Sequence, residues 1–573
     1  MKSRSNRVQV QLCVCLAIML VNAASHSASE SAVSGTRGVV ATRSMLASEV
    51  GAKILERGGN AIDAAVAVGF ALAVTYPSAG NLGGGGFMVI HLADGTVATN
   101  DHREKAPLGA SADMYLGENG DVVRGLSTQT HLAVGVPGTV AGLLDVLERH
   151  GTLDRATVIQ PAIDLAKDGF LLNRDLAGQF ARRVQSFAKY PATHAIFSKD
   201  GVPYAEGDRF VQMDLAATLE RIKADGRDGF YKGKTADLIV AEMQTHEGLI
   251  SHEDLQSYES RWREPIRGTY RGHDIVSMPP PSSGGVLLVQ MLNMLEPYDQ
   301  SASGFGGAQT IHRMIEAERR AYADRAEYLG DPDFFPVPIA ELTSKNYAKG
   351  RFADFKSDKA GVSGDIGPGR IAVESPETTH VSVMDSAGNA VAYTTTLNLS
   401  YGAKMVAAGT GVLLNNEMDD FSAKENVPNF YGLLGRQANA IAPAKRMLSS
   451  MTPTIVLRDG KPLLVTGSPG GSTIITTTLQ VIVNVIDHGM NLADAVASPR
   501  FHHQWQPDRV IHEEFAFSPD TKTLLQQMGH TNLNAISSFM GRGIGDANSV
   551  MRTDGGIVGK SDPRNVGGAV GVR

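Results

Sequence analysis

Apolar residues recur along the chain with helical and strand-like periods in alternation. The pattern over residues 45–57 predicts a helix that ends at Gly58-Gly59. Asn60 is placed to cap a second helix that runs to about Val74, and its nearly all-apolar sequence predicts burial on every side. We predict further helices at 139–149, 158–167 and 311–328, and strands at 87–92, 379–385, 390–396, 453–456 and 463–466. This mixture is typical of an α/β protein.

The first residues have the pattern of an export signal. Lys2, Arg4 and Arg7 precede an apolar run over residues 8–21, and small residues follow it. The run is shorter than the roughly 20 apolar residues that span a bilayer. We therefore expect residues 1–25 to be a signal peptide and the protein to be periplasmic or secreted, with no membrane span. A mitochondrial presequence or an N-terminal core helix is the alternative.

Removal of this segment changes the chemistry of the chain. Both cysteines, Cys13 and Cys15, leave with it, so the mature protein would have no thiol and no disulfide. The formal net charge also moves from −7 to −10, because three positive charges are lost. Such an acidic protein is not expected to bind nucleic acid. The chain is 42% hydrophobic and 20% charged, as in a folded protein.

A covalent enzyme without cysteine must use Ser, Thr, Lys, Tyr or a carboxylate as its nucleophile. The stretch 467–471 (GSPGG) does not fit the G-x-S-x-G elbow. H-E-x-x-H is absent, and His502 and His503 are adjacent, so they do not share a helix face. The glycines at 83–86 match neither nucleotide-binding fingerprint. We expect no metal and no cofactor.

One threonine stands at a position that suits a self-cleaving precursor. The glycine-rich segment 361–370 leads through Glu377 to Thr378, where a strand-like run begins. Many loops enter strands in this way, so the pattern alone is weak.

Several motifs together, in order, are more specific. They are NLGGGGF at 81–87, REKAP at 103–107, ETTH at 377–380, TTLN at 395–398, LNNEMDDFS at 414–422, LSSM at 448–451, GSPGGS at 467–472 and PRFHHQW at 499–505. With them the sequence closely resembles the γ-glutamyltranspeptidase family of N-terminal nucleophile hydrolases, over nearly the whole chain after the signal.

The resemblance implies a fold and a way of making the active enzyme. The fold would be a four-layer αββα sandwich formed jointly by two chains cut from one precursor. Residues 26–377 would be the large chain and 378–573 the small one, although length alone would allow three or four domains. The cut would fall between Glu377 and Thr378, so that the freed α-amine of Thr378 serves as base for its own hydroxyl.

The resemblance also assigns residues to the site. Thr378 would be the nucleophile, Thr396 its hydrogen-bonding partner, and Gly470 and Gly471 the oxyanion donors. Arg103 would bind the donor's α-carboxylate with Ser449 and Ser450, Asn398, Glu417 and Asp420 would hold its ammonium, and Tyr431 would cover the site from a lid loop. Read singly, these residues also fit a surface ion pair, a helix cap, a glycosylation motif, a solvated turn and a surface loop. His380 is interpreted as structural, because the α-amine makes a histidine base unnecessary.

The implied function is an exported, self-processing γ-glutamyltransferase and glutathione hydrolase. Its partners would be glutathione and other γ-glutamyl compounds, amino-acid or peptide acceptors and water. The alternatives are a cephalosporin-type β-lactam acylase or a poly-γ-glutamate hydrolase on the same scaffold. A non-catalytic periplasmic protein that binds amino acids is an alternative of another class, and it predicts no chain cleavage.

Overall fold

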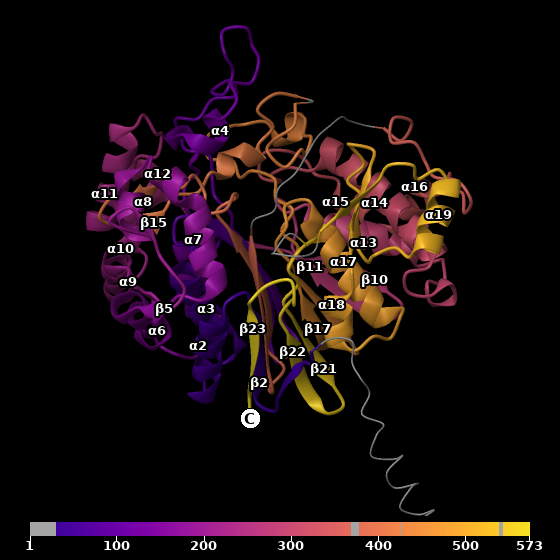
Figure 1. Ribbon diagram of the computed structural model, residues 1–573, viewed down its shortest axis with the longest axis horizontal. Helices are drawn as coiled ribbons and strands as arrows, with labels where there is room; N and C mark the ends of the chain where they lie inside the picture. Colours follow the sequence, from indigo (N-terminus) through magenta and orange to yellow (C-terminus); the bar gives the residue numbers. More distant parts are fainter. Residues whose placement is uncertain (1–29, 368–377, 426, 538–542) are drawn as a thin grey trace, which may run out of the picture. The chain divides into compact units, whose positions relative to one another are not determined.

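Two antiparallel sheets of seven strands each form the centre of the protein (Figure 1). The computed structural model describes residues 30–367, 378–425, 427–537 and 543–573. Residues Ala32–Arg573 make one compact unit rather than several domains. Within the described ranges, no helix has the length and apolarity that a bilayer crossing requires.

The first sheet alternates strands from both sides of residue 378. Its order is β23 (Gly568–Val572), β2 (Gly38–Thr42), β12 (Thr379–Asp385), β13 (Ala390–Thr396), β3 (Gly85–His91), β4 (Val97–His102) and β9 (Arg261–Arg263). The hairpin β12–β13 therefore lies between β2 and β3, two strands from early in the chain. Thr378 directly precedes β12, so it lies at the end of one of the central strands of this sheet.

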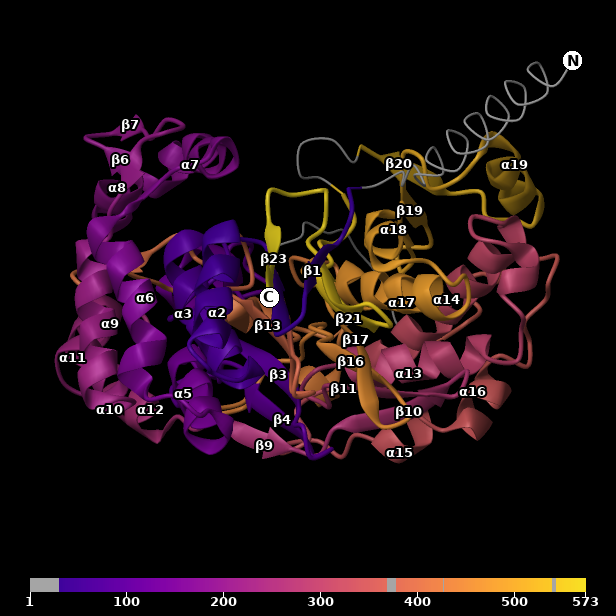
Figure 2. The ribbon, with the colours of Figure 1, turned by 90° about the horizontal axis from the view of Figure 1, so that it is seen from below.

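The second sheet is packed on the first. Its order is β1 (Val33–Gly35), β22 (Gly556–Lys560), β21 (Ser549–Thr553), β17 (Lys461–Thr466), β16 (Thr454–Arg458), β11 (His273–Ser277) and β10 (Ile266–Tyr270). Buried apolar side chains of both sheets, such as Phe87 and Val89 of β3 and Val276 of β11, form the core between them. The layers are seen edge-on in Figure 2.

Helices cover the two outer faces. The first sheet is covered by α2 (Met45–Glu56), α3 (Ala61–Thr75), α5 (Thr139–His150), α6 (Arg155–Asp168), α7 (Arg174–Phe187), α8 (Pro191–Phe197), α9 (Met213–Asp225), α10 (Asp228–Tyr231), α11 (Gly233–Thr245) and α12 (His252–Ser257). The second is covered by α13 (Gly284–Leu295), α14 (Ala308–Tyr328), α15 (Ile339–Leu342), α16 (Lys345–Arg351), α17 (Thr473–Ile486), α18 (Leu492–Ala497) and α19 (Pro519–Gln527). The result is the expected αββα sandwich.

Short elements complete the chain. They are α4 (Leu126–Gln129), the 3₁₀ turns η1 (His131–Ala133), η2 (Ser301–Ser303), η3 (Glu417–Asp420) and η4 (Gln437–Asn439), and the strands β5 (Phe170–Leu171), β6 (Ser198–Lys199), β7 (Val202–Pro203), β8 (Arg209–Phe210), β14 (Val406–Ala407), β15 (Val412–Leu413), β18 (Phe501–His502), β19 (Val510–Glu513) and β20 (Leu533–Ile536).

The predicted elements are present. Asn60 caps α3 through its side chain, with Asp63 bonding back to the Asn60 N–H, and every residue of α3 is buried. Strands β12 and β13 have the predicted bounds. Gly284 and Gly285 begin α13, and an added Cβ on Gly285 would meet the carbonyl oxygen of Met278 at 2.3 Å. Close backbone approach, not flexibility, explains that glycine.

Candidate active site

Thr378 lies directly before β12, beside the end of β13. Its Oγ is 3.4 Å from the Oγ of Thr396, the last residue of β13. The Thr396 hydroxyl is held in turn by the backbone N–H of Asn398, which donates to it at 2.8 Å. Thr378 is only 6% exposed, yet it lines a pocket of about 110 Å³. Glu377, the other half of the expected cleavage site, lies outside the described residues.

Gly470 and Gly471 sit at the start of α17, and Gly470 lines the same pocket as Thr378. Their φ angles are +133° and +56°, a region that favours glycine. A Cβ on Gly470 would lie 2.3 Å from the Thr473 hydroxyl, which donates to the Gly470 carbonyl. Among the described residues, no hydrogen bond uses the N–H of either glycine. Gly470 therefore shares the pocket of Thr378, and the N–H groups of both glycines stay predicted donors to an oxyanion.

Tyr431 lies against Gly471. Its hydroxyl donates to the carbonyl of Asn398 at 2.5 Å, and an added Cβ on Gly471 would lie 2.7 Å from the tyrosine ring. Tyr431 is only 4% exposed, so it is not part of an open surface loop. The N–H of Phe430 donates to Asp419 at 2.9 Å, and this bond fastens the loop beside the tyrosine.

Arg103 is the centre of a buried charged group, which we call the arginine–carboxylate cluster: Arg103, Glu104, Glu417 and Asp420. The guanidinium donates to Glu417 and, at 2.5 Å, to Asp420, and Glu104 is 3.5 Å away. Its Nε donates to the Met447 carbonyl at 3.3 Å. Arg103 is fully buried, which excludes the surface ion pair.

Carboxyl groups outnumber cations in this cluster. Burial raises the pKa of Glu104 to about 7 against the opposing effect of Arg103, and it raises the pKa values of Glu417 and Asp420 too. Burial alone would lower the pKa of Arg103, but the carboxylates raise it above its usual value. One guanidinium faces three carboxyl groups, so the cluster would be stabilised by an additional cation.

Ser449 and Ser450, the two serines expected in the donor site, are both buried. Ser449 accepts at its carbonyl from the N–H and the hydroxyl of Ser283, both at 2.7 Å. The Ser450 hydroxyl accepts from Arg325 at 3.2 Å, and Arg325 also donates to the Ser283 hydroxyl at 2.9 Å. Neither serine caps a helix, and both are buried.

A path of hydrogen bonds joins the threonine to the cluster. Beyond Thr396, the side-chain amide of Asn398 donates to the carbonyl of Asn416 at 2.9 Å, and Asn416 directly precedes Glu417. Asn398 is 2% exposed, which argues against a glycosylated surface site. The expected site residues are thus brought together in one connected region.

Three residues with a supporting role were not assigned from the sequence. Asn81 donates to the Thr396 carbonyl at 2.8 Å and accepts from the Gly84 N–H, so it fixes the end of β13. Arg325 donates to the Ser450 hydroxyl, and Asp419 accepts from the Ser127 hydroxyl at 2.6 Å and from the Phe430 N–H at 2.9 Å. The motif NLGGGGF contains Asn81 and could have pointed to it, whereas nothing local marks Arg325.

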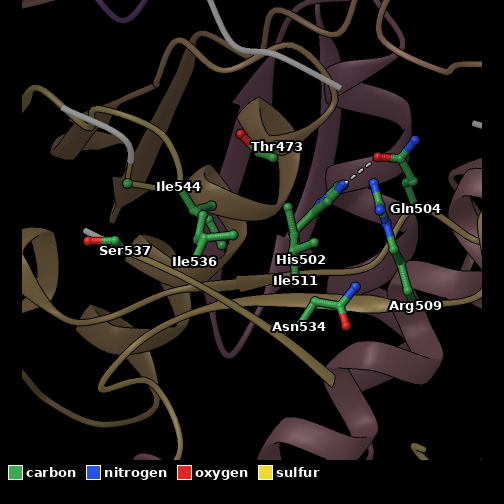
Figure 3. A pocket seen from close by; sticks show the side chains of 10 residues that line it. Thr473, His502, Gln504, Arg509, Ile511, Asn534, Ile536, Ser537 and Ile544 are labelled. Carbon is green, nitrogen blue, oxygen red and sulfur yellow. Dashed lines mark hydrogen bonds between the residues drawn. The ribbon is translucent and has the colours of Figure 1, made fainter. Parts of the chain in front are cut away.

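The histidines near the motifs are structural in this arrangement. His380 hydrogen-bonds Thr394 at 2.8 Å and Ser382 at 3.1 Å, and burial lowers its pKa to about 3. His502 contacts Ser472, Thr476 and Gln504. It lines a hollow of about 470 Å³ together with Thr473 and Arg509 (Figure 3). Thr378 does not line this larger hollow, so we place the reactive site in the smaller pocket.

An αββα sandwich with a threonine at the head of a central strand has the architecture of the N-terminal nucleophile hydrolases. The crystal structure of a cephalosporin acylase from Bacillus halodurans shares this fold, with a TM-score of 0.83, 24% identity and coverage of 96% of this chain and 99% of that one.

Sequence comparison defines the family. Residues 47–572 match the Gamma-glutamyltranspeptidase family, and the chain belongs to it. It is 52% identical over 505 residues to the glutathione hydrolase proenzyme of Pseudomonas sp. (strain A14), covering 88% of each chain. It is 41% identical over 508 residues to the acylase ACY 1 proenzyme of Pseudomonas sp. (strain SE83), covering 87% of each.

Proposed function

We propose that this protein is an exported, self-processing γ-glutamyltransferase and glutathione hydrolase. The observation that carries the proposal is the connected region from Thr378 through Thr396 and Asn398 to the arginine–carboxylate cluster. It combines a nucleophile with a recognition site for a group that bears both charges. The 52% identity to a glutathione hydrolase proenzyme supports the same assignment.

Processing would use the same hydroxyl as catalysis. The Thr378 Oγ attacks the carbonyl carbon of Glu377, the peptide nitrogen leaves as the α-amine of Thr378, and an ester joins the two residues. Water then hydrolyses the ester, giving the Glu377 carboxylate and the free threonine. The products are a large chain that ends at 377 and a small chain of residues 378–573, which remain together as a heterodimer.

In the processed enzyme one residue would supply both nucleophile and base. An α-amine has a reference pKa of about 7.7–8.0, close to working pH, so it can take the proton from Oγ. Oγ attacks the γ-carbonyl of the donor, the N–H groups of Gly470 and Gly471 stabilise the oxyanion, and the amine leaves with a proton. Water or the amine of an amino acid or peptide then resolves the γ-glutamyl-threonine ester.

Donor binding would exchange ion pairs rather than create isolated charges. The donor's α-carboxylate takes over part of the Arg103 guanidinium, and its α-ammonium is bound by Glu417, Asp420 and Asn398. Because the cluster already has more carboxyl groups than cations, the incoming ammonium lowers the raised pKa values of Glu417 and Asp420. Ser449 and Ser450 add hydroxyl groups on the carboxylate side.

A β-lactam acylase is the second candidate, supported by the 41% identity to acylase ACY 1. A side-chain acylase or a poly-γ-glutamate hydrolase would share Thr378 but would need no complete site for a free α-amino acid group. The buried cluster around Arg103 favours the γ-glutamyl donor. A non-catalytic amino-acid-binding protein would leave the chain intact.

The test is Thr378→Ala, measured by intact mass spectrometry and by turnover of γ-glutamyl-p-nitroanilide. The wild type should give two chains with a break at 377/378, and the variant one uncut, inactive chain. Thr379→Val is the matched control, because the Thr379 hydroxyl is buried and has no hydrogen-bond partner among the described residues. It should cleave and turn over normally. Normal cleavage of Thr378→Ala would sink the assignment.

A further inference from the structure

A second group of convergent side chains lies away from the active-site pocket. His131 in η1, Glu242 in α11 and His246, the residue that ends α11, direct their polar atoms at one point. The Nε2 of His131 is 3.1 Å from the Glu242 Oε1, and the Nε2 of His246 is 3.6 Å from the same oxygen. All three ligand atoms lie within 4.8 Å of one another.

These separations suit a tetrahedral metal ion. Ligands about 2.0–2.1 Å from Zn²⁺ stand roughly 3.3 Å apart in a tetrahedron. Two imidazoles and one carboxylate are a known ligand set for zinc, and it leaves the fourth position for water. The two imidazole rings stack at 4.6 Å between their centroids, and the His246 side chain is 51% exposed.

Access fits the same interpretation. The His131 side chain is 7% exposed, Glu242 15% and His246 51%, so the ligand set is anchored on one side and open on the other. The three residues line a hollow of about 730 Å³, through which an ion and water can enter.

The other histidine–carboxylate group among the described residues is unsuited to a cation. His312, Glu316 and His530 are all buried, and Arg319 and Arg320 already occupy the Glu316 carboxylate. A metal ion there would face two guanidinium groups. In the part of the chain that the structure describes, Glu242 forms ion pairs with His131 and His246 and with no lysine or arginine.

We propose that His131, Glu242 and His246 form a binding site for one Zn²⁺ ion, with water as the fourth ligand. The sequence predicted no metal centre, because His131 is 111 residues from Glu242 and the three ligands match no spacing motif. The ion would fasten α11 to the segment at 126–133. That segment also supports the active site, since Ser127 donates to Asp419 and the Thr128 carbonyl accepts from Asn416 at 3.0 Å.

The test is calorimetric titration of ZnCl₂ into the full-length protein, purified without a polyhistidine tag and stripped with EDTA. We expect one ion per chain, with affinity at least 10-fold weaker in His246→Asn and in Glu242→Gln. His252→Asn is the matched control, because His252 is similarly exposed and pairs with a single carboxylate, Asp237, at 3.5 Å. It should bind zinc as the wild type does.

Three outcomes would overturn the site. They are no zinc binding by the wild type at micromolar concentrations, unchanged affinity in His246→Asn, and loss of binding in His530→Asn with retention in His246→Asn. The exposed position of His246 makes that variant safe for folding, and a melting curve without zinc checks this. Because the ligands take no part in the proposed reaction, a failed zinc site leaves the γ-glutamyl assignment untouched.

Discussion

Gly471→Ala tests the oxyanion donors and the lid together. The substitution adds one methyl group to a residue with φ +56°, and that methyl would lie 2.7 Å from Cδ1 and 3.0 Å from Cε1 of Tyr431. The ring cannot simply recede, because its hydroxyl is bonded to the Asn398 carbonyl. We expect the backbone of Gly471 to rotate and its N–H to leave the position in which we propose that it stabilises the oxyanion.

The magnitude follows from two separate effects. An alanine in the left-handed region costs about 1–2 kcal/mol, which the fold can tolerate. Loss of one oxyanion donor lowers kcat roughly 100- to 1000-fold, or about 2.7–4 kcal/mol in the barrier. The variant should therefore be folded and nearly inactive.

The assay is kcat on γ-glutamyl-p-nitroanilide, measured on material that mass spectrometry shows to be processed. Gly489→Ala is the control: its φ is +62° and no atom lies within 4 Å of the added Cβ. It should lose similar stability and keep full activity. If Gly471→Ala retains kcat within about threefold of the control, the reasoning about the donors is refuted.

Two further substitutions test the recognition site. Arg103→Lys keeps the charge but removes the planar fork, so KM for γ-glutamyl-p-nitroanilide should rise roughly 10- to 100-fold with kcat little changed, and an unchanged KM would contradict the carboxylate role. Asp419→Asn tests the raised pKa of Asp419, which burial moves from 3.8 to about 6. Because the folded protein holds the protonated carboxyl more tightly than the unfolded chain does, the stability that this proton contributes is complete below about pH 4 and is lost as pH rises through 6. The difference in unfolding free energy, wild type minus variant, should fall by at most about 3 kcal/mol from pH 4 to 7 in denaturant titrations, and a flat difference would show that folding does not raise the pKa of Asp419.

Local sequence pattern predicted the elements that local physics determines. The cap at Asn60 and the all-apolar run after it are sufficient for α3. The bounds of β12 and β13 follow from β-branched residues on both sides of the turn near Gly388. The site residues were assigned through the motifs of the family, and the structure brings them into one region.

Long-range pairing is what the sequence could not show. REKAP marks Arg103, but nothing in it indicates that carboxylates 314 and 317 residues away occupy the guanidinium. Arg325 lies in the last turn of α14, where a basic residue is ordinary, although it donates to the Ser450 hydroxyl. Such partners depend on which faces of distant elements meet, and periodicity reports only which face is apolar.

The topology explains how a chain could be cut beside its own active site and keep its fold. β12 pairs with β2 along residues 381–385, and β13 pairs with β3 along all seven of its residues, so the small chain is inserted between two strands of the large one. A cut before Thr378 breaks no strand pairing, because Thr379 is the first paired residue of β12. The new terminus stays fixed by the sheet, and the α-amine appears on the residue whose hydroxyl already lies 3.4 Å from Thr396. Cleavage at this position therefore adds a base to a site whose remaining groups are already in place.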